Sequence, residues 1–279
     1  MNGASLAALA CPVCRRPLAE VAAALRCQAG HSFDIAREGH VTLLPGDVRP
    51  GGDTREMVAA RAAFLAAGHL APLNAAIDAA AAAALAHDPP GVLLDLGAGT
   101  GHHLARLLDA RPERAGVALD ASRAAARRAA RAHPRLAAVV CDVWRGLPVR
   151  DGSAALVLDA FAPRNAREIA RALAPEGRLL VVTPTAAHMA ELVEALGLLT
   201  VDPRKPERMS ATLGAHLERG ATSSCEFAME LSHADVRHAA VMGPSAHHID
   251  RDELAARIAA LPRPMRVTAS ATVATYRPY

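Results

Sequence analysis

Short apolar runs alternate with amphipathic or alanine-rich stretches over most of the chain. The runs predict buried strands at 91–96, 115–119, 137–141, 154–159 and 178–183. The stretches between them predict helices at 102–110, 122–132 and 164–173. Because strand and helix alternate, we expect parallel βαβ units and an α/β fold.

The two ends of the chain extend this pattern. Near the C-terminus, two more strands are predicted at 226–232 and 266–276, with helices near 233–242 and 250–260. Seven strands are therefore expected in the sheet, the last two closing it as a β-pair. Before the alternating region, Thr54 offers an N-cap to a helix over 55–67, and an alanine-rich helix follows over 69–87.

A glycine- and proline-rich segment predicts the domain boundary. Residues 46–53 contain three glycines and a proline, a composition typical of a linker. The linker separates a small domain, residues 1–45, from a large one, residues 54–279. Segment 33–45 is predicted to be strand material that completes the small domain.

The most informative motif follows the strand predicted at 91–96. Asp95 ends that strand, and Gly97, Gly99 and Gly101 follow at alternate positions. Dinucleotide-binding folds use G-x-G-x-x-G to hold a pyrophosphate at a helix N-terminus. Here the third glycine comes one residue earlier, so the run D-x-G-x-G-x-G resembles motif I of Rossmann-like S-adenosylmethionine (SAM) methyltransferases. The sulfonium of SAM is a cation, which suits an acidic strand end.

Two further acids stand at predicted strand ends. Asp120 is placed to take both ribose hydroxyls, and Asp142 to reach the adenine amine. Ligands in open α/β sheets bind at the carboxyl ends of the strands. Any α/β protein has glycine turns and capping acids, but three such acids in this order favour SAM. The predicted cofactor-binding residues are Asp95, Gly97, Gly99, Gly101, His103, Leu104, Asp120, Asp142 and Val143.

The N-terminal segment carries a metal motif. Cys11, Cys14, Cys27 and His31 have the spacing C-x2-C-x12-C-x3-H, which places four ligands for a tetrahedral Zn²⁺. So short a segment cannot bury a stable core, so the metal would supply its folding energy. The ligand set is closed, which indicates a structural zinc rather than a catalytic one. Cys141 and Cys225 lie outside the motif and are expected to be buried thiols.

Composition indicates the cellular location of the protein more than its function. The net charge of +3 is too mild to indicate nucleic acid, and Lys205 is the only lysine among many arginines. We find no signal-peptide pattern or apolar stretch of membrane-spanning length, and expect a soluble, cytoplasmic protein with no membrane or DNA partner.

The zinc motif and the glycine motif together resemble the RlmA-type 23S rRNA (guanine-N1)-methyltransferases over essentially the whole chain. The matching strings include FDIAREGHVTLLP, MVAARAAFLAAGHLAPL and DAFAPRNAREIARAL. GTGHHLARLL, CDVWRGLPVRDG and VMGPSAHHIDRDEL are most similar to the actinobacterial tylosin-resistance branch. The resemblance implies SAM-dependent methylation of a guanine N1 in hairpin 35 of 23S rRNA, a link to macrolide resistance, and a homodimer that holds RNA between its domains.

The chain departs from the family at a few positions. Leu70 stands where some members have a tyrosine that touches the cofactor, so a ring contact is lost. The glycine motif is GAGTG rather than GCGEG, and His102 and His103 follow where others have tyrosines. None of these changes removes a group that the reaction requires.

The loop after the strand at 154–159 lies where many SAM enzymes hold the target base. Phe161 and Pro163 are placed to stack on a purine, and Arg164 to donate to O6 or to a phosphate. Asp159 is placed to accept the N1 proton or the exocyclic amine. Core packing for Phe161 and helix capping for Asp159 are alternatives of similar weight. His188, after the strand at 178–183, would face the cofactor or substrate, although a lone histidine is more often structural.

Arginines supply the candidates for RNA contact. Arg15, Arg16 and Arg26 decorate the zinc motif and are favoured as RNA ligands. Arg123, Arg127 and Arg131 recur every four residues, with Arg128 beside them, but a solvated helix face explains them as well. Two other functions remain open: a small-molecule methyltransferase, and a zinc-dependent RNA-binding protein that no longer catalyses.

Overall fold

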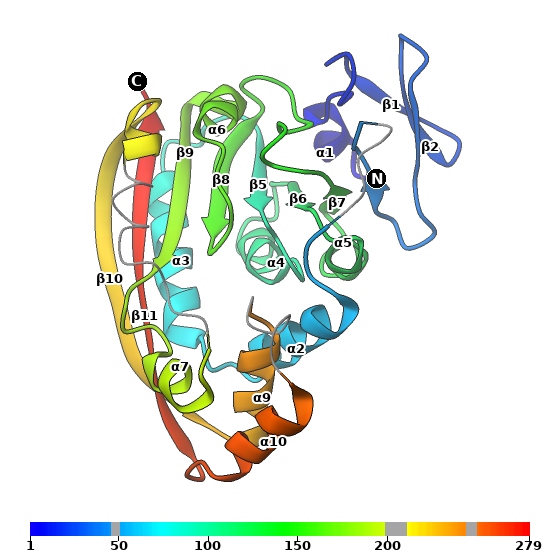
Figure 1. Ribbon diagram of the computed structural model, residues 1–279. Coiled ribbons are helices and arrows are strands. Elements are labelled where there is room, and N and C mark those ends of the chain that lie inside the picture. Colours follow the sequence, from blue (N-terminus) through cyan, green and yellow to red (C-terminus); the bar gives the residue numbers. More distant parts are fainter. Residues whose placement is uncertain (46–50, 199–210, 244–249) are drawn as a thin grey trace.

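The structure is a computed structural model that describes residues 1–45, 51–198, 211–243 and 250–279 (Figure 1). Its central sheet has the strand order β10-β11-β9-β8-β5-β6-β7-β4. These strands are β4 (Val41–Thr42), β5 (Val92–Leu96), β6 (Gly116–Asp120), β7 (Leu136–Val140), β8 (Ala154–Ala160), β9 (Leu173–Pro184), β10 (Leu217–Leu231) and β11 (Met265–Pro278). The strands from β4 to β9 are parallel, and β10 and β11 pair antiparallel at the other edge.

The predicted α/β fold is confirmed, with eight strands in the central sheet rather than seven. The extra strand is β4, in which Val41 and Thr42 pair in parallel with β7, and Leu43 then donates its N–H to the Val140 carbonyl at 2.9 Å. Segment 33–45 was predicted to complete the small domain, but Val41 and Thr42 belong to the central sheet instead. Two residues are too few to show the apolar pattern of a sheet strand.

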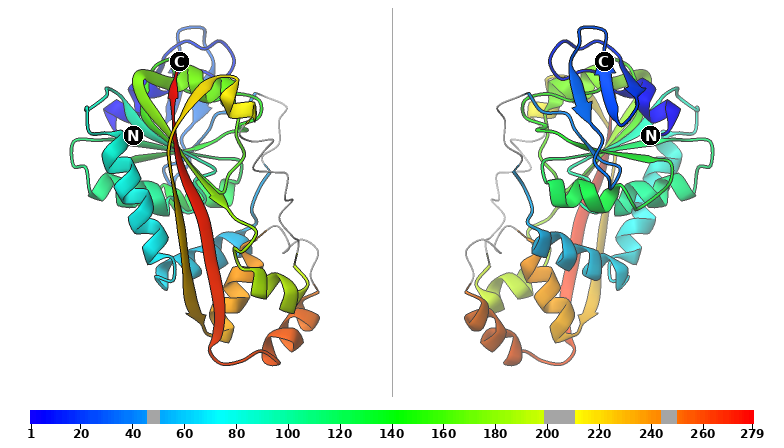
Figure 2. Two further views of the ribbon diagram at one scale, coloured as in Figure 1. Left: turned by 90° about the vertical axis from the view of Figure 1, so that its left-hand side faces the viewer. Right: turned by 90° about the vertical axis from the view of Figure 1, so that its right-hand side faces the viewer.

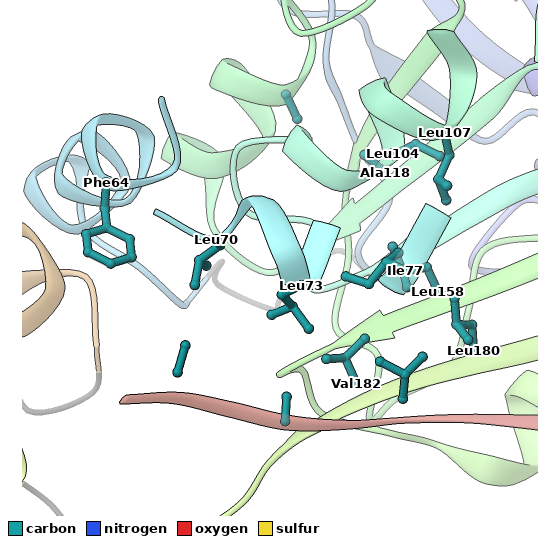
Figure 3. Packing of buried hydrophobic residues seen from close by; sticks show 14 of the residues in the cluster. Phe64, Leu70, Leu73, Ile77, Leu104, Leu107, Ala118, Leu158, Leu180 and Val182 are labelled. Atoms are coloured by element: carbon teal, nitrogen blue, oxygen red, sulfur yellow. The ribbon is translucent and has the colours of Figure 1, made fainter. Parts of the chain in front are cut away.

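One face of the sheet is covered by three helices, one before the glycine motif and two after it. These are α3 (Ala71–Ala84), α4 (His102–Asp109) and α5 (Arg123–Ala129). Leu73 and Ile77 of α3 and Leu107 of α4 meet strand residues such as Leu180 in one apolar core (Figure 3). Phe64 of α2 (Arg55–Ala66) joins the same core from beyond the strand ends.

A second group of helices lies beyond the sheet. Helices α2, α7 (Ala190–Leu196), α9 (His233–Val241) and α10 (Arg251–Ala259) gather near one end of the long antiparallel pair β10–β11 (Figure 1). The N-terminal residues lie near the other end of the molecule (Figure 2). The linker predicted over 46–53 lies mostly outside the described residues.

The opposite face of the sheet is covered by α6 (Ala166–Ala172) and by an N-terminal unit, residues 1–40. That unit contains α1 (Gly3–Ala8) and a separate antiparallel sheet, β1 (Leu18–Val21), β2 (Ala24–Cys27) and β3 (Ser32–Asp34). Leu9 and Leu25 share a core with Val92 and Leu94, whereas Leu93 faces the helices on the other side. This alternation is the period of two expected for a strand buried on both faces.

The N-terminal unit occupies space that a crossover helix normally fills. Parallel strands are usually joined through a helix, yet residues 141–153, between β7 and β8, contain none. Ala10 donates to the Pro148 carbonyl at 2.9 Å, and Arg150 donates to the Ala8 carbonyl at 2.8 Å. The buried Ser5 hydroxyl donates to the Gly116 carbonyl at 3.1 Å. The unit is thus bonded into the sheet layer.

We predict that Leu25→Ala lowers the free energy of unfolding of the whole protein by about 2–5 kcal/mol, because Leu25 is fully buried in the shared core. Urea unfolding should show one transition at a lower midpoint. Val21→Ala, on the same small sheet but 45% exposed, is the matched control and should change stability by less than about 0.5 kcal/mol. An early separate transition of the N-terminal unit would contradict the shared core.

Candidate cofactor and metal sites

The turn after β5 is built from glycines that no other residue can replace without strain. Gly97, Gly99 and Gly101 have φ of 62°, 54° and 76°, in the left-handed region. A Cβ at Gly97 would lie 2.6 Å from the Ala162 Cβ, so this glycine lets the loop after β8 approach. The motif therefore fixes both the backbone of the turn and its packing against the neighbouring loop.

Asp95 is a buried acid with one unused oxygen. Its residue is 2% exposed, and among the described residues its Oδ2 has no hydrogen-bond partner. Burial, with the nearby charges of Asp159 and Asp120, raises the pKa of Asp95 well above its usual value, against the effect of a hydrogen bond from the Leu104 amide. A positively charged ligand group would relieve this penalty, which is the property expected of a residue that receives the cationic part of SAM.

Asp120 and Asp142 stand at the same edge of the sheet. Asp120 Oδ2 accepts from Gly99 N at 2.8 Å and Oδ1 accepts from Ser122 N at 2.7 Å, and burial raises its pKa. Each oxygen keeps a second lone pair for a hydroxyl. Asp142 Oδ1 accepts from Trp144 N at 3.0 Å. The acids predicted from three separate strand ends therefore meet along one edge, which fits an extended nucleoside.

The remaining predicted cofactor residues contribute mainly through their backbone or by packing. Leu104 is fully buried, and its amide bonds to Asp95 rather than standing open. Val143 is buried. Burial lowers the pKa of His103 to about 3, so this ring is neutral, and it lies edge-on to His102 with centroids 5.2 Å apart.

The sequence interpretation missed Arg61. This residue of α2 lies over the glycine turn, because a Cβ at Gly99 would stand 3.2 Å from the Arg61 Cδ. Its Nη2 donates to Asp53 Oδ2 at 2.7 Å and to the Met242 carbonyl at 2.8 Å. Its buried Nε has no partner in the described part of the chain. The helix pattern placed Arg61 on α2 but carried no sign that α2 crosses the turn.

The loop after β8 and the end of β9 bring two predicted residues together. Phe161 has φ of 58°, is 40% exposed, and stacks on His188 with ring centroids 5.4 Å apart and planes at 27°. His188 Nδ1 accepts from Ser270 N at 3.2 Å, and burial lowers the pKa of this histidine. Because Nδ1 accepts this hydrogen bond, the neutral His188 ring carries its proton on Nε2. Pro163 is exposed on the same loop.

Asp159 and Arg164 pair with each other. Arg164 Nε lies 2.9 Å from Asp159 Oδ1, and the two side chains are 7% and 0% exposed. Arg164 Nη2 also donates to the Val182 carbonyl at 3.4 Å. This geometry disfavours the prediction that Arg164 reaches O6 or a phosphate and that Asp159 takes the N1 proton directly, because both are committed to a buried ion pair. Neither residue's burial is visible from a loop sequence.

The four predicted metal ligands converge. The ligand atoms of Cys11, Cys14, Cys27 and His31 all lie within 4.8 Å of one another. His31 Nδ1 lies 3.5 Å from Cys11 Sγ and 3.3 Å from Cys27 Sγ, and Cys14 and Cys27 Sγ are 3.6 Å apart. A tetrahedral Zn²⁺ places such atoms about 3.5–3.8 Å apart, so the cluster fits zinc. Burial acts to raise the pKa of Cys27, but hydrogen bonds from His31, Ala29 and Cys14 together lower it to about 6, which favours the thiolate ligand.

Arg15 has a structural task that the sequence interpretation did not foresee. Its guanidinium donates to the Leu147 carbonyl at 2.7 Å and the Val149 carbonyl at 3.1 Å, and so ties the metal knuckle to the loop before β8. Arg16, in the loop before β1, and Arg26, on β2, are both exposed. On α5, Arg127 pairs with Glu38 at 2.9 Å. Of the three arginines favoured for RNA, Arg15 is therefore engaged within the chain.

A sheet with a glycine turn, strand-end acids and an attached Cys3His zinc cluster defines a zinc-containing, SAM-dependent methyltransferase. Residues 9–49 match the family model described as "RlmA, N-terminal", and residues 93–177 match the one described as "Methyltransferase domain". The chain belongs to the 23S rRNA (guanine-N1)-methyltransferase family, because relatives of that description are 48–50% identical to it over 97% of its length.

Curated relatives cover nearly the whole chain. A "Putative 23S rRNA (guanine-N(1)-)-methyltransferase" of Micromonospora griseorubida is 50% identical over 97% of each chain. The "23S rRNA (guanine(748)-N(1))-methyltransferase" of Streptomyces fradiae is 48% identical over 97% of this chain and 96% of its own. A Bacillus subtilis relative is 32% identical over 70% of each chain.

None of the helices in the described ranges has the length and apolarity to span a membrane.

We predict that Asp95→Asn stabilises the cofactor-free protein but weakens SAM binding. The raised pKa of Asp95 means that its ionised form costs stability, and this cost appears as pH rises through that pKa. The melting temperature of the free variant should rise by about 2 °C or more at neutral pH, while its SAM affinity, measured by calorimetry, falls about tenfold or more. Asp109→Asn, with a side chain 74% exposed, is the control and should change neither. Unchanged SAM affinity would exclude Asp95 from the cofactor site.

We predict that zinc removal destabilises the entire molecule. Because the N-terminal unit shares a core with the sheet, Cys14→Ser or a strong chelator should lower the melting temperature by about 10 °C or more. Cys225→Ser, outside the cluster, should leave both zinc content and melting temperature unchanged. A metal-free protein that melts like the zinc-bound one would show that the cluster carries no structural load.

Proposed function

We propose that the protein transfers the methyl group of SAM to N1 of a guanine in hairpin 35 of 23S rRNA. This proposal is carried by the 48% identity, over 97% of the chain, to a curated 23S rRNA (guanine(748)-N(1))-methyltransferase. The converging Cys3His ligand set and the three acids at the sheet edge support it. The role in the cell is proposed to be resistance to tylosin-type macrolides. We also propose a cytoplasmic homodimer, as the family resemblance implies.

In this proposal, acids at three strand ends each bind a different part of SAM. When bound, SAM supplies an electrophilic methyl group. Asp95 lies near its positively charged part, Asp120 accepts hydrogen bonds from its ribose hydroxyls, and Asp142 accepts one from its adenine amine. Arg61, whose Nε is buried and unpartnered beside Gly99 in the described chain, binds the cofactor's carboxylate.

The target base needs a site outside the duplex, because guanine N1 lies on the Watson–Crick edge. Phe161 and Pro163, both exposed on the loop after β8, stack on the purine. The Nε2 proton of His188 donates to O6, where negative charge gathers as N1 loses its proton to solvent. The Asp159–Arg164 ion pair positions this loop against the glycine turn rather than touching the base.

The test is incubation of the zinc-loaded protein with methyl-labelled SAM and a hairpin 35 transcript, followed by mapping with reverse transcription. Label should enter the RNA and cause a stop at one guanine, and Asp95→Asn should lower the rate at limiting SAM. A transcript with adenine at that position is the control and should remain unlabelled. A stop at another base, or no stop, would defeat the proposal. RNA binding without label would favour the non-catalytic protein, and label on a small molecule the alternative methyltransferase.

A further inference from the structure

The only tryptophan of the chain, Trp144, is held in solvent beside the cofactor edge. Its residue is 66% exposed, and the other exposed large apolar residues in the described ranges are Val13, Val21, Phe161 and Tyr279. It lies on the loop that follows β7, two residues after Asp142. An indole buries one of the largest apolar areas of any side chain when it is covered. Leaving it exposed therefore gives up stabilisation of the fold, and a binding partner that covers the ring would recover it.

The loop that carries Trp144 is fixed from within and from α6. Trp144 N donates to Asp142 Oδ1 at 3.0 Å. Asn165, the N-cap of α6, donates through Nδ2 to the carbonyls of Val143 at 3.2 Å and Trp144 at 3.3 Å. The backbone on either side of the indole is therefore bonded, and the ring does not hang on a loose loop.

A second set of bonds fixes the loop further along. Glu168 of α6 accepts from Leu147 N at 2.9 Å. The Leu147 carbonyl accepts from Arg171 at 3.0 Å and from Arg15 of the zinc knuckle at 2.7 Å. Side chains from two different parts of the chain thus clamp one short loop. A rigid aromatic platform binds a partner at low entropic cost.

The surroundings of the indole fit a nucleic acid. Asn165 follows the loop of Phe161 and Pro163 directly, so the Trp144 loop is bonded to the end of the proposed base-binding loop. Arg145, next in the chain, has a side chain that is 62% exposed, and its Nε lies 3.5 Å from Asp142 Oδ2. An exposed aromatic ring with an adjacent guanidinium is the pair of groups that stacks on an unpaired base and meets its phosphate.

We propose that Trp144 is a stacking platform for an unpaired base of the substrate RNA, next to the methylated guanine. This rests on the proposed function, since it takes an RNA hairpin as the substrate. Trp144 positions the RNA and takes no part in the chemical step. Single-stranded bases stack on such platforms without strong sequence preference, so the contact contributes affinity and register, while selection of the guanine stays with the loop after β8.

The sole tryptophan makes the test direct, because all indole fluorescence comes from this position. Titration of the zinc-loaded protein with a hairpin 35 transcript should quench the emission. Trp144→Ala should weaken binding of end-labelled hairpin about tenfold or more and raise the KM for RNA with little change in kcat. Trp144→Phe should restore binding to within about threefold of the wild type. SAM affinity, measured by calorimetry, should be the same in all three proteins. Val21→Ala, another exposed apolar residue, is the control and should bind RNA normally.

Three results would overturn the proposal. Unchanged hairpin binding and methylation in Trp144→Ala would remove Trp144 from the RNA interface while leaving the proposed function intact. Quenching by S-adenosylhomocysteine alone, with weaker SAM binding in the variant, would make the indole an adenine contact. Emission that changes with protein concentration in the absence of RNA would assign the ring to an interface between copies of the chain. Failure of the wild-type protein to label the hairpin would instead count against the proposed function itself.

Discussion

Burial of the second sheet face beneath the N-terminal unit is the contact on which both sites depend. The connection from β7 to β8 lacks a helix, so Val92, Leu94, Val117 and their neighbours would face water without Leu9 and Leu25. The zinc cluster holds the unit that covers them, because so short a segment cannot hold its shape alone. The same cover fixes the loop after β7 through Arg15, and that loop carries Asp142. Metal binding, sheet burial and the cofactor edge are thus parts of one packed structure.

The fold was predictable where one apolar run makes one strand. The strands β5 to β8 match their predicted ranges closely, because a strand buried on both faces carries a continuous apolar signal. The signal fails elsewhere for physical reasons. The first half of β10 is exposed and polar, so only its last residues were predicted. Strand β4 is too short to show a pattern, and α1 and β1–β3 lie in a unit that depends on metal and on the sheet rather than on its own core.

The sites divide in the same way. Spacing alone brought together Cys11, Cys14, Cys27 and His31, and strand ends placed Asp95 and Asp120 at one edge, since both arguments follow from local geometry. Contacts between segments that are distant in the sequence could not be predicted. Nothing in the sequence indicates that Arg61 lies over Gly99, that Arg164 turns inward to Asp159, or that Arg15 bonds to carbonyls more than a hundred residues away.

The missing crossover helix has a consequence for how such a protein can change over time. A zinc ribbon appended by a linker is a module, free to be lost, exchanged or duplicated without harm to its neighbour. Here the ribbon replaces an internal layer of the catalytic fold, down to a hydroxyl on Gly116 and a strand paired with β7 immediately after it. Exchange of the ribbon for an unrelated one would therefore expose the part of this sheet face that α6 does not cover.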